Sequence, residues 1–262
     1  MQIEDIKTLL ANELKAVDTE IMRQLETPIT LINQLAQYLI NSGGKRLRPM
    51  LTLLTAKALN YPGSEHVVLA ALIEFIHTAT LLHDDVVDSS DLRRGNETAN
   101  SIWGNESSVL VGDFLFSRAF QMMITLKSES IIAKLADTTN ALASGEVNQL
   151  MHRHKPDIDE ETYFAIIRAK TAELFAAACS TAAELADTDS ATQIAMQDYG
   201  LALGYAFQLI DDVLDYSGDK DTMGKNLGDD LAEGKMTLPI IRCLQQSSPE
   251  QQDASQYHST YR

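Results

Sequence analysis

Residues 64–88 read SEHVVLAALIEFIHTATLLHDDVVD, and this stretch decides the fold class. It is nearly continuous in apolar residues and far longer than an ordinary strand, so it predicts a buried helix. No proline lies between Pro62 and Pro156. Alanine, leucine, isoleucine, glutamate and glutamine dominate, and straight-chain residues lose little rotamer freedom in a helix. The sequence therefore predicts an all-α protein.

Helical periodicity continues on both sides of this central helix. Further helices are expected over residues 2–25, 28–41, 45–59, 98–124, 128–151, 160–186 and 190–216, and a last one near Thr237. Polar loops are expected at 89–97 and at 152–159, where His152 and His154 are interpreted as ordinary surface residues. The segment 217–235 is too long and glycine-rich for a simple connector, which is typical of functional loops. We therefore expect one helical domain over residues 1–244, with about nine or ten helices and no competing strand pattern, and a polar tail at 245–262.

The charge of the chain restricts its partners. Its 262 residues include 21 lysines and arginines and 37 aspartates and glutamates, a formal charge of −16. A surface this acidic repels nucleic acid and anionic lipid, so we expect neither as a partner. If the substrates are anions, local lysines, arginines and metal ions have to overcome the global field.

Cysteine usage and the N-terminal sequence predict a cytoplasmic protein. The two cysteines, Cys179 and Cys243, fall in apolar, helix-like stretches, so we expect buried free thiols in a reducing compartment. The first residues, MQIEDIKTLLANELK, are charged and amphipathic and lack the apolar core of a signal peptide. No apolar run is expected to approach the roughly 18 residues of a membrane span.

Two aspartate clusters of the form D-D-x-x-D end two of the long apolar helices. The six residues are Asp84, Asp85 and Asp88 in the first and Asp211, Asp212 and Asp215 in the second. Residues four apart share a helix face, so two carboxylates in each cluster should point together and repel each other. The negative end of the helix dipole adds to that repulsion. Mg²⁺ suits the arrangement, because it prefers carboxylate oxygens and shares its shell with water and substrate phosphates.

Basic residues gather beside these clusters or beside glycines. Residues 43–49, GGKRLRP, begin a helix whose backbone amides, with Lys45 and Arg48, are suited to binding a diphosphate. The other basic residues follow the clusters directly: Arg93, Arg94, Lys225 and Lys235. A single acidic cluster is explained equally well as a solvated helix end, and a lone lysine is better explained as a solvated surface charge. The repetition and the shared placement favour a metal-assisted diphosphate site.

The chain resembles the trans-isoprenyl diphosphate synthases, and within them the long-chain, octaprenyl-like branch. The matching segments are GGKRLRP at 43–49, EFIHTATLLHDDVVDSSDLRRG at 74–95, KTA at 170–172, FQLIDDVLDYSGD at 207–219 and GKNLGDDLAEGKMTLP at 224–239. The resemblance implies the all-α isoprenoid synthase fold, Mg²⁺ as cofactor and a homodimer. It also implies an enzyme that joins isopentenyl diphosphate to an allylic diphosphate such as farnesyl diphosphate. The implied product is a long all-trans chain such as octaprenyl diphosphate, of the kind used in quinone side chains.

The same resemblance implies roles for individual residues. Asp84, Asp88 and Asp211 resemble direct Mg²⁺ ligands, with Asp85, Asp212 and Asp215 in supporting or water-mediated positions. Catalysis is implied to rest on these six aspartates with Lys170 and Lys225. The groups that resemble the allylic diphosphate site are Arg93, Lys170, Thr171, Gln208, Lys225 and Lys235. Those that resemble the isopentenyl diphosphate site are Lys45, Arg48, His77 and Arg94, although its apolar neighbours alone favour His77 as a core histidine.

Product length is expected to depend on Ala79 and Thr80, which lie about one turn before Asp84. The growing chain should run down the bundle core, away from the aspartates and past these residues. Short-chain relatives carry bulky aromatic residues near these positions. Both residues are small here, so we expect an open tunnel and a long product.

The C-terminal residues depart from the family pattern. Family members usually continue for several helices after the TLP segment at 237–239, whereas this chain ends soon after Cys243 with DASQYHSTYR. A non-catalytic partner subunit of a prenyl transferase is therefore the alternative function, although the degraded aspartate motifs that would support it are not seen. A helical terpene cyclase is a third interpretation, which GGKRLRP argues against because a cyclase has no second diphosphate to hold.

Overall fold

The computed structural model describes residues 3–41, 44–93, 95–217 and 228–247. Arg94, Lys225 and most of the 245–262 segment therefore lie outside the described residues. Within the described ranges the regular secondary structure is helical apart from one hairpin of two-residue strands, β1 (Leu92–Arg93) and β2 (Asn96–Glu97). Leu92 pairs with Glu97 in this antiparallel hairpin. The all-α prediction is confirmed, and the hairpin is an addition within the expected loop at 89–97.

The helices follow the expected order along the chain. Their bounds are α1 (Ile3–Leu9), α2 (Ala11–Leu25), α3 (Thr30–Asn41), α4 (Leu47–Ala58), α5 (Glu65–Val87), α6 (Ala99–Trp103), α7 (Asn105–Thr125), α8 (Glu129–Met151), α9 (Glu160–Ile167), η1 (Arg168–Ala172), α10 (Glu173–Leu185), α11 (Ser190–Ser217), α13 (Asp229–Ala232) and α14 (Leu238–Gln246). Short α13 lies within the segment that was expected to be a glycine-rich loop.

Three of the expected helices are interrupted. The first breaks at Leu10, between α1 and α2, and the helix expected over 98–124 divides into α6 and α7 at Gly104. Gly104 has φ +86, a conformation that L side chains rarely adopt. The helix expected over 160–186 contains η1, a π-helical turn. Such turns are rare and occur frequently at functional sites, and this one carries Lys170 and Thr171.

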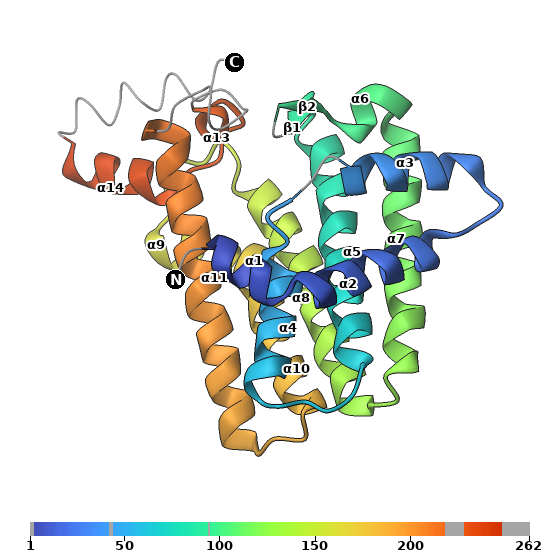
Figure 1. The fold of residues 1–262 in the computed structure, drawn as a ribbon. Coiled ribbons are helices and arrows are strands. Elements are labelled where there is room, and N and C mark those ends of the chain that lie inside the picture. The colour runs from blue at the N-terminus through green and yellow to red at the C-terminus, as the bar shows by residue number, and fades with distance from the viewer. Residues whose placement is uncertain (1–2, 42–43, 94, 218–227, 248–262) are drawn as a thin grey trace.

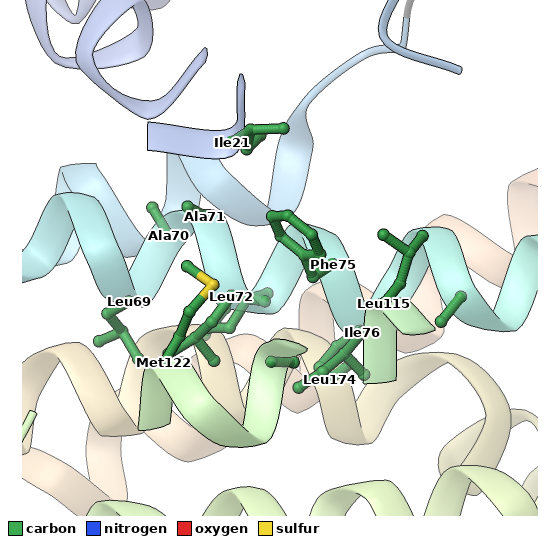
Figure 2. Packing of buried hydrophobic residues seen from close by; sticks show 14 of the residues in the cluster. Ile21, Leu69, Ala70, Ala71, Leu72, Phe75, Ile76, Leu115, Met122 and Leu174 are labelled. Atoms are coloured by element: carbon green, nitrogen blue, oxygen red, sulfur yellow. The ribbon is translucent and has the colours of Figure 1, made fainter. Parts of the chain in front are cut away.

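The core of the bundle is built around α5, which packs on α2, α4, α7 and α10. Figure 2 shows Leu72 and Ile76 of α5 among core side chains that include Met122 of α7 and Leu174 of α10. By length and composition α5 could cross a membrane, so the expectation that no apolar run approaches that length is wrong. More than half of its most apolar window, 56%, is buried inside the bundle, as for the core helix of a globular domain.

Glycines allow α11 to lie directly against α10 and η1. A Cβ on Gly200 would lie 2.5 Å from the carbonyl oxygen of Phe175, and one on Gly204 would lie 2.5 Å from the Cα of Ala172. Both obstacles are backbone atoms, which cannot rotate aside as a side chain would. The close approach places Gln208, one turn after Gly204, beside Thr171 of η1.

The arrangement brings both aspartate clusters to one end of the bundle. Figure 1 shows α5 and α11 ending at the same end, where the β1–β2 hairpin and α13 also lie. Cys179 is buried in α10, as expected, and burial raises its pKa to about 11. Cys243 is exposed on α14, so the expectation that both thiols are buried is wrong.

Candidate active site

A cavity of about 960 Å³ lies where α5 and α11 end. Among the described residues, nearly all of the predicted site side chains line it: Lys45, Arg48, His77, Thr80, Asp84, Asp85, Asp88, Arg93, Lys170, Thr171, Gln208, Asp211, Asp212 and Lys235. Two predicted residues are not part of this lining. Asp215 is fully buried beside the cavity wall, and Ala79 is fully buried in the core cluster.

Two carboxylates of the first cluster have cationic partners of different kinds. Asp84 lies 3.6 Å from the Nζ of Lys170. Asp85 is only 4% exposed and accepts hydrogen bonds from Nε and Nη2 of Arg93 at 2.8 and 2.6 Å. Burial raises the pKa of Asp85 even though Arg93 opposes that shift. Asp85 is therefore held by hydrogen bonds to Arg93. Asp84 is farther from its partner, Lys170, and interacts with it only electrostatically.

Asp88 is held by two cations at once. Arg153 donates to Oδ1 of Asp88, and the Nζ of Lys235 donates to Oδ2 at 2.8 Å. Burial alone would raise the pKa of Asp88, but Lys235, Lys170 and Arg153 outweigh it and hold the pKa below its usual range. Asp88 is therefore ionised and fully compensated in the chain alone.

A hydrogen-bond chain positions Asp212 of the second cluster. The hydroxyl of Tyr163 donates to Oδ2 of Asp212, and the side-chain amide of Gln208 donates to Oδ1 at 2.8 Å. Gln208 in turn accepts from the hydroxyl of Thr171 at 2.8 Å. Asp212 is 2% exposed, and this chain ties it to both α9 and η1. Asp212 is therefore a buried carboxyl group with a fixed orientation at the cavity wall.

The other two aspartates of that cluster do not share one environment. Asp211 is exposed and lines the cavity. Asp215 is fully buried, accepts from the amide of Asp230 at 3.3 Å, and accepts from the amide of Gly228 through its carbonyl at 2.9 Å. Asp211 and Asp215, one turn apart in α11, therefore differ in burial, and Asp215 contacts the start of α13 instead of lining the cavity.

Lys170 is held at the cavity by α8. Its Nζ donates to Glu146 at 2.8 Å and to Gln149 at 2.9 Å. Burial raises the pKa of Glu146 to about 6, opposed by Lys170 and reinforced by Asp84. Gly145 allows the contact, because a Cβ there would lie 2.8 Å from the Cβ of Ala169. Sequence analysis missed Glu146 and Gln149, although their spacing of three residues on one helix face beside a glycine could have indicated them.

The cations near the start of α4 form a second group on the cavity wall. Nη1 of Arg48 lies 3.2 Å from Nε2 of His77, and the guanidinium stacks 4.4 Å from the ring centre of Phe175. The Nζ of Lys45 lies 5.8 Å from the ring centre of Phe207. His77 is half-buried and faces Arg48 across the cavity wall, which favours a site residue over a core histidine.

The carboxylates fit a divalent cation that is shared with a ligand. Among the described residues, no three acidic, histidine or cysteine side chains converge into a site built from protein groups alone. Mg²⁺ does not require such a cage, because it is usually held by one or two carboxylates, several waters and substrate phosphates. Asp84, Asp88 and Asp211 line one cavity from two helices and offer only hard oxygen donors. This donor set fits a cation of that kind.

Fold and site together define the class of protein. An all-helical bundle that places two D-D-x-x-D clusters and at least five cationic side chains around one cavity is an isoprenoid synthase. The family described as polyprenyl synthetase matches residues 29–260. The chain belongs to this polyprenyl synthetase family.

Relatives and solved structures agree with this assignment. The chain is 52% identical to octaprenyl diphosphate synthase of Escherichia coli (strain K12), over 96% of this chain and 78% of that protein. It is 43% identical to the geranyl-diphosphate-specific all-trans-nonaprenyl-diphosphate synthase of Rhodobacter capsulatus, over 95% and 77%. A crystal structure of polyprenyl synthase from Caulobacter crescentus CB15, complexed with calcium and isoprenyl diphosphate, aligns with a TM-score of 0.93 at 44% identity, over 98% and 83%.

Proposed function

We propose that this chain joins isopentenyl diphosphate to an allylic diphosphate and extends it to a long all-trans polyprenyl diphosphate, such as octaprenyl diphosphate. One observation carries the proposal: two aspartate clusters and two groups of cations line the same cavity. A relative that is 52% identical is an octaprenyl diphosphate synthase, which supports the long product. The activity is that of a trans-prenyl transferase, in keeping with the family.

The cations that line the cavity form two groups, one for each diphosphate. Lys170, Lys235 and Arg93 stand next to the first aspartate cluster and suit the allylic diphosphate, which is the leaving group. Lys45 and Arg48 stand at the start of α4 and suit the isopentenyl diphosphate. Two groups of cations are what a reaction between two diphosphates requires, and a cyclase needs one.

The reaction follows from this division. The allylic carbon–oxygen bond breaks, and the diphosphate leaves with the bonding electrons while Lys170, Lys235 and Arg93 stabilise its charge. The double bond of isopentenyl diphosphate attacks the allylic cation and forms the new carbon–carbon bond. A proton then leaves the adjacent carbon, and the released diphosphate is the proposed acceptor. Apolar wall residues such as Leu115 and Phe207 exclude the water that would quench the cation.

Mg²⁺ is the proposed cofactor, with Asp84, Asp88 and Asp211 as the residues that would hold it. When bound, the ion would supply positive charge to the leaving diphosphate. Asp85 and Asp212 are already hydrogen-bonded to Arg93 and Tyr163, which supports the supporting role proposed for both. Calcium in the Caulobacter crescentus structure supports a divalent cation at this site.

Product length, assembly and location complete the proposal. Thr80 lines the cavity, and Ala79 is fully buried, so we propose that both permit a long chain.

A homodimer is proposed, because α7 exposes large apolar side chains such as Leu110 and Ile124. The protein is proposed to be cytoplasmic. No observation favours the alternative of a non-catalytic partner subunit, since all six cluster aspartates are present and five of them line the cavity.

The deciding experiment is incorporation of labelled isopentenyl diphosphate with Mg²⁺ and either farnesyl or geranyl diphosphate, followed by sizing of the products. The proposal expects a ladder that ends in a long polyprenyl chain and that disappears with a chelator. The two primers separate a preference like that of the geranyl-specific relative from a preference for farnesyl diphosphate. A folded, dimeric sample that incorporates no label with either primer would refute catalysis by this chain alone.

A further inference from the structure

Arg153 contacts the aspartate cluster but does not line the cavity. Its guanidinium donates to Oδ1 of Asp88 and, at 3.4 Å, to the carbonyl of Val87 at the end of α5. Its side chain is 16% exposed, and its Nε is buried without a hydrogen-bond partner among the described residues. Arg153 therefore approaches Asp88 from behind the cavity wall.

Lys235 contacts the other oxygen of the same carboxylate. It lines the cavity, and its Nζ donates to Oδ2 of Asp88 at 2.8 Å and also lies 2.6 Å from Glu233. The two oxygens of Asp88 therefore have different surroundings. Oδ1 is held by Arg153, which lies outside the cavity lining, and Oδ2 is held by Lys235, which is part of that lining.

A backbone contact fixes the two cations relative to each other. The amide of His154 donates to the carbonyl of Gly234 at 2.8 Å, and these residues are the immediate neighbours of Arg153 and Lys235. Gly234 has φ +75, and a Cβ there would lie 2.4 Å from the ring of His154. The loop after α8 and the segment before α14 are therefore joined at the point where both cations meet Asp88.

We propose that Arg153 is a positioning residue, which holds Asp88 by Oδ1 so that Oδ2 stays directed at a divalent cation in the cavity. Lys235 is then the exchangeable partner that occupies Oδ2 when no cation is bound. This inference rests on the proposed function, because it takes Asp88 as a ligand of the cofactor. Hydrogen bonds to a liganding carboxylate fix its orientation, and removing such a partner commonly weakens metal binding by about 10–100-fold.

The proposal predicts different effects from two substitutions that each remove one positive charge from beside the same carboxylate. Arg153→Gln should weaken binding of Mn²⁺, used here as the probe, by about tenfold because Asp88 is no longer fixed. Lys235→Gln should leave Mn²⁺ binding unchanged or tighter, because a competitor for Oδ2 is removed. Binding is measured by calorimetry and by the paramagnetic signal of free Mn²⁺, without any substrate. Arg242→Gln, which breaks an exposed ion pair with Glu160, is the control for net charge.

Arg153→Lys tests orientation separately from charge. It keeps the cation but loses the planar fork that reaches both Asp88 and Val87, so it should restore part of the affinity lost in Arg153→Gln. It also keeps the test available if Arg153→Gln does not fold, as judged by circular dichroism. Arg153→Lys would then bind Mn²⁺ more weakly than the wild type.

The outcomes separate the inference from the function on which it rests. Weaker binding in Arg153→Gln and equal or tighter binding in Lys235→Gln support the proposal. Tighter or unchanged binding in Arg153→Gln shows that Arg153 competes with the cation or is irrelevant to it, and overturns the proposal while the function stands. A wild-type chain that binds no Mn²⁺ but makes polyprenyl products overturns the inference alone, and one that does neither overturns both.

Discussion

Gly200→Ala tests whether the close contact of α10 and α11 supports the site. Alanine is favoured over glycine in a helix interior by about 1 kcal/mol, so propensity alone predicts a more stable variant. The structure predicts the opposite. The added Cβ would lie 2.5 Å from the carbonyl oxygen of Phe175 and 2.6 Å from the Cα of Ala176, and these backbone atoms cannot move without separating the helices.

Overpacking of this kind costs about 1–3 kcal/mol, and a clash with backbone belongs at the upper end. After the gain in propensity, we expect a net loss of about 1–2 kcal/mol in the free energy of unfolding. Separation of the helices should also lengthen the hydrogen bond between Thr171 and Gln208, which is 2.8 Å in the structure. Prenyl transfer should therefore fall together with stability.

Urea unfolding followed by circular dichroism measures the change, and the labelled-substrate assay measures activity. Ala202→Gly is the matched control, because Ala202 is exposed on the same helix and should lose only the propensity term of about 1 kcal/mol, with activity retained. A Gly200→Ala variant that is as stable as the wild type, or more stable, would refute the close packing on which this reasoning depends.

Three further predictions address product length, a buried hydrogen bond and pH. Ala79→Phe and Thr80→Phe should both shorten the product. Thr80→Phe should lose less stability, because Thr80 lines the cavity and Ala79 is fully buried. Product sizing and urea unfolding measure these effects, and unchanged products in both variants would contradict the prediction. Tyr163→Phe removes a hydrogen-bond donor to buried Asp212 and should lower the free energy of unfolding by about 1.5–3 kcal/mol. The control Tyr61→Phe loses a hydrogen bond to exposed Glu65 and should lower it by less than about 1 kcal/mol. Equal losses in the two variants would argue against the buried network. Burial raises the pKa of Glu146 from 4.5 to about 6. The protonated carboxyl therefore stabilises the folded protein below pH 4.5, and this stabilisation falls by on the order of 2 kcal/mol as the pH rises through 6. Glu146→Gln removes this fall, so the stability of the variant relative to the wild type should increase with pH between 5 and 7.5, and a flat difference would show that the carboxyl is not perturbed.

The spacing of the aspartates predicted part of the site, because helix geometry is local. Asp84 and Asp88 are one turn apart and both line the cavity, as helical periodicity requires. Asp211 and Asp215 are also one turn apart, in α11, but only Asp211 lines the cavity. Asp215 turns into the protein because the amide of Asp230 lies within 3.3 Å of its carboxylate. That contact joins residues from separate helices, and no local pattern in the sequence encodes it.

The residues that sequence analysis missed act through partners distant in the chain. Glu146 holds Lys170, Tyr163 holds Asp212, and Arg153 holds Asp88. Each is a single polar residue at or near a helix end, where surface groups are also common. The hydrophobic pattern that fixes the helices does not show which of them turn inward. Of the three, only Glu146 has a local signal, which is its spacing from Gln149 beside Gly145.

The interruptions of the helices show the same division between local and tertiary causes. Gly104 has a positive φ, and a glycine between two helical segments is a signal that the sequence does contain. The break at Leu10 has no such signal, since leucine is a strong helix former. The π-turn of η1 inserts one residue into the helix that contains Lys170, and η1 packs against α8 and α11, which are distant contacts that a local pattern does not encode.

The internal ion pairs reconcile a chain of charge −16 with anionic substrates. In the chain alone, Arg93, Lys170 and Lys235 are each paired with an aspartate of the first cluster. Breaking a buried pair by removing one partner is costly, so the lysines can pass to a diphosphate only if the carboxylates gain another cation at the same time. Metal and diphosphate should therefore bind cooperatively, each more tightly in the presence of the other. Titration of Mn²⁺ with and without a non-hydrolysable allylic diphosphate analogue measures this coupling, and equal Mn²⁺ affinities in the two titrations would show that the ion pairs are not exchanged.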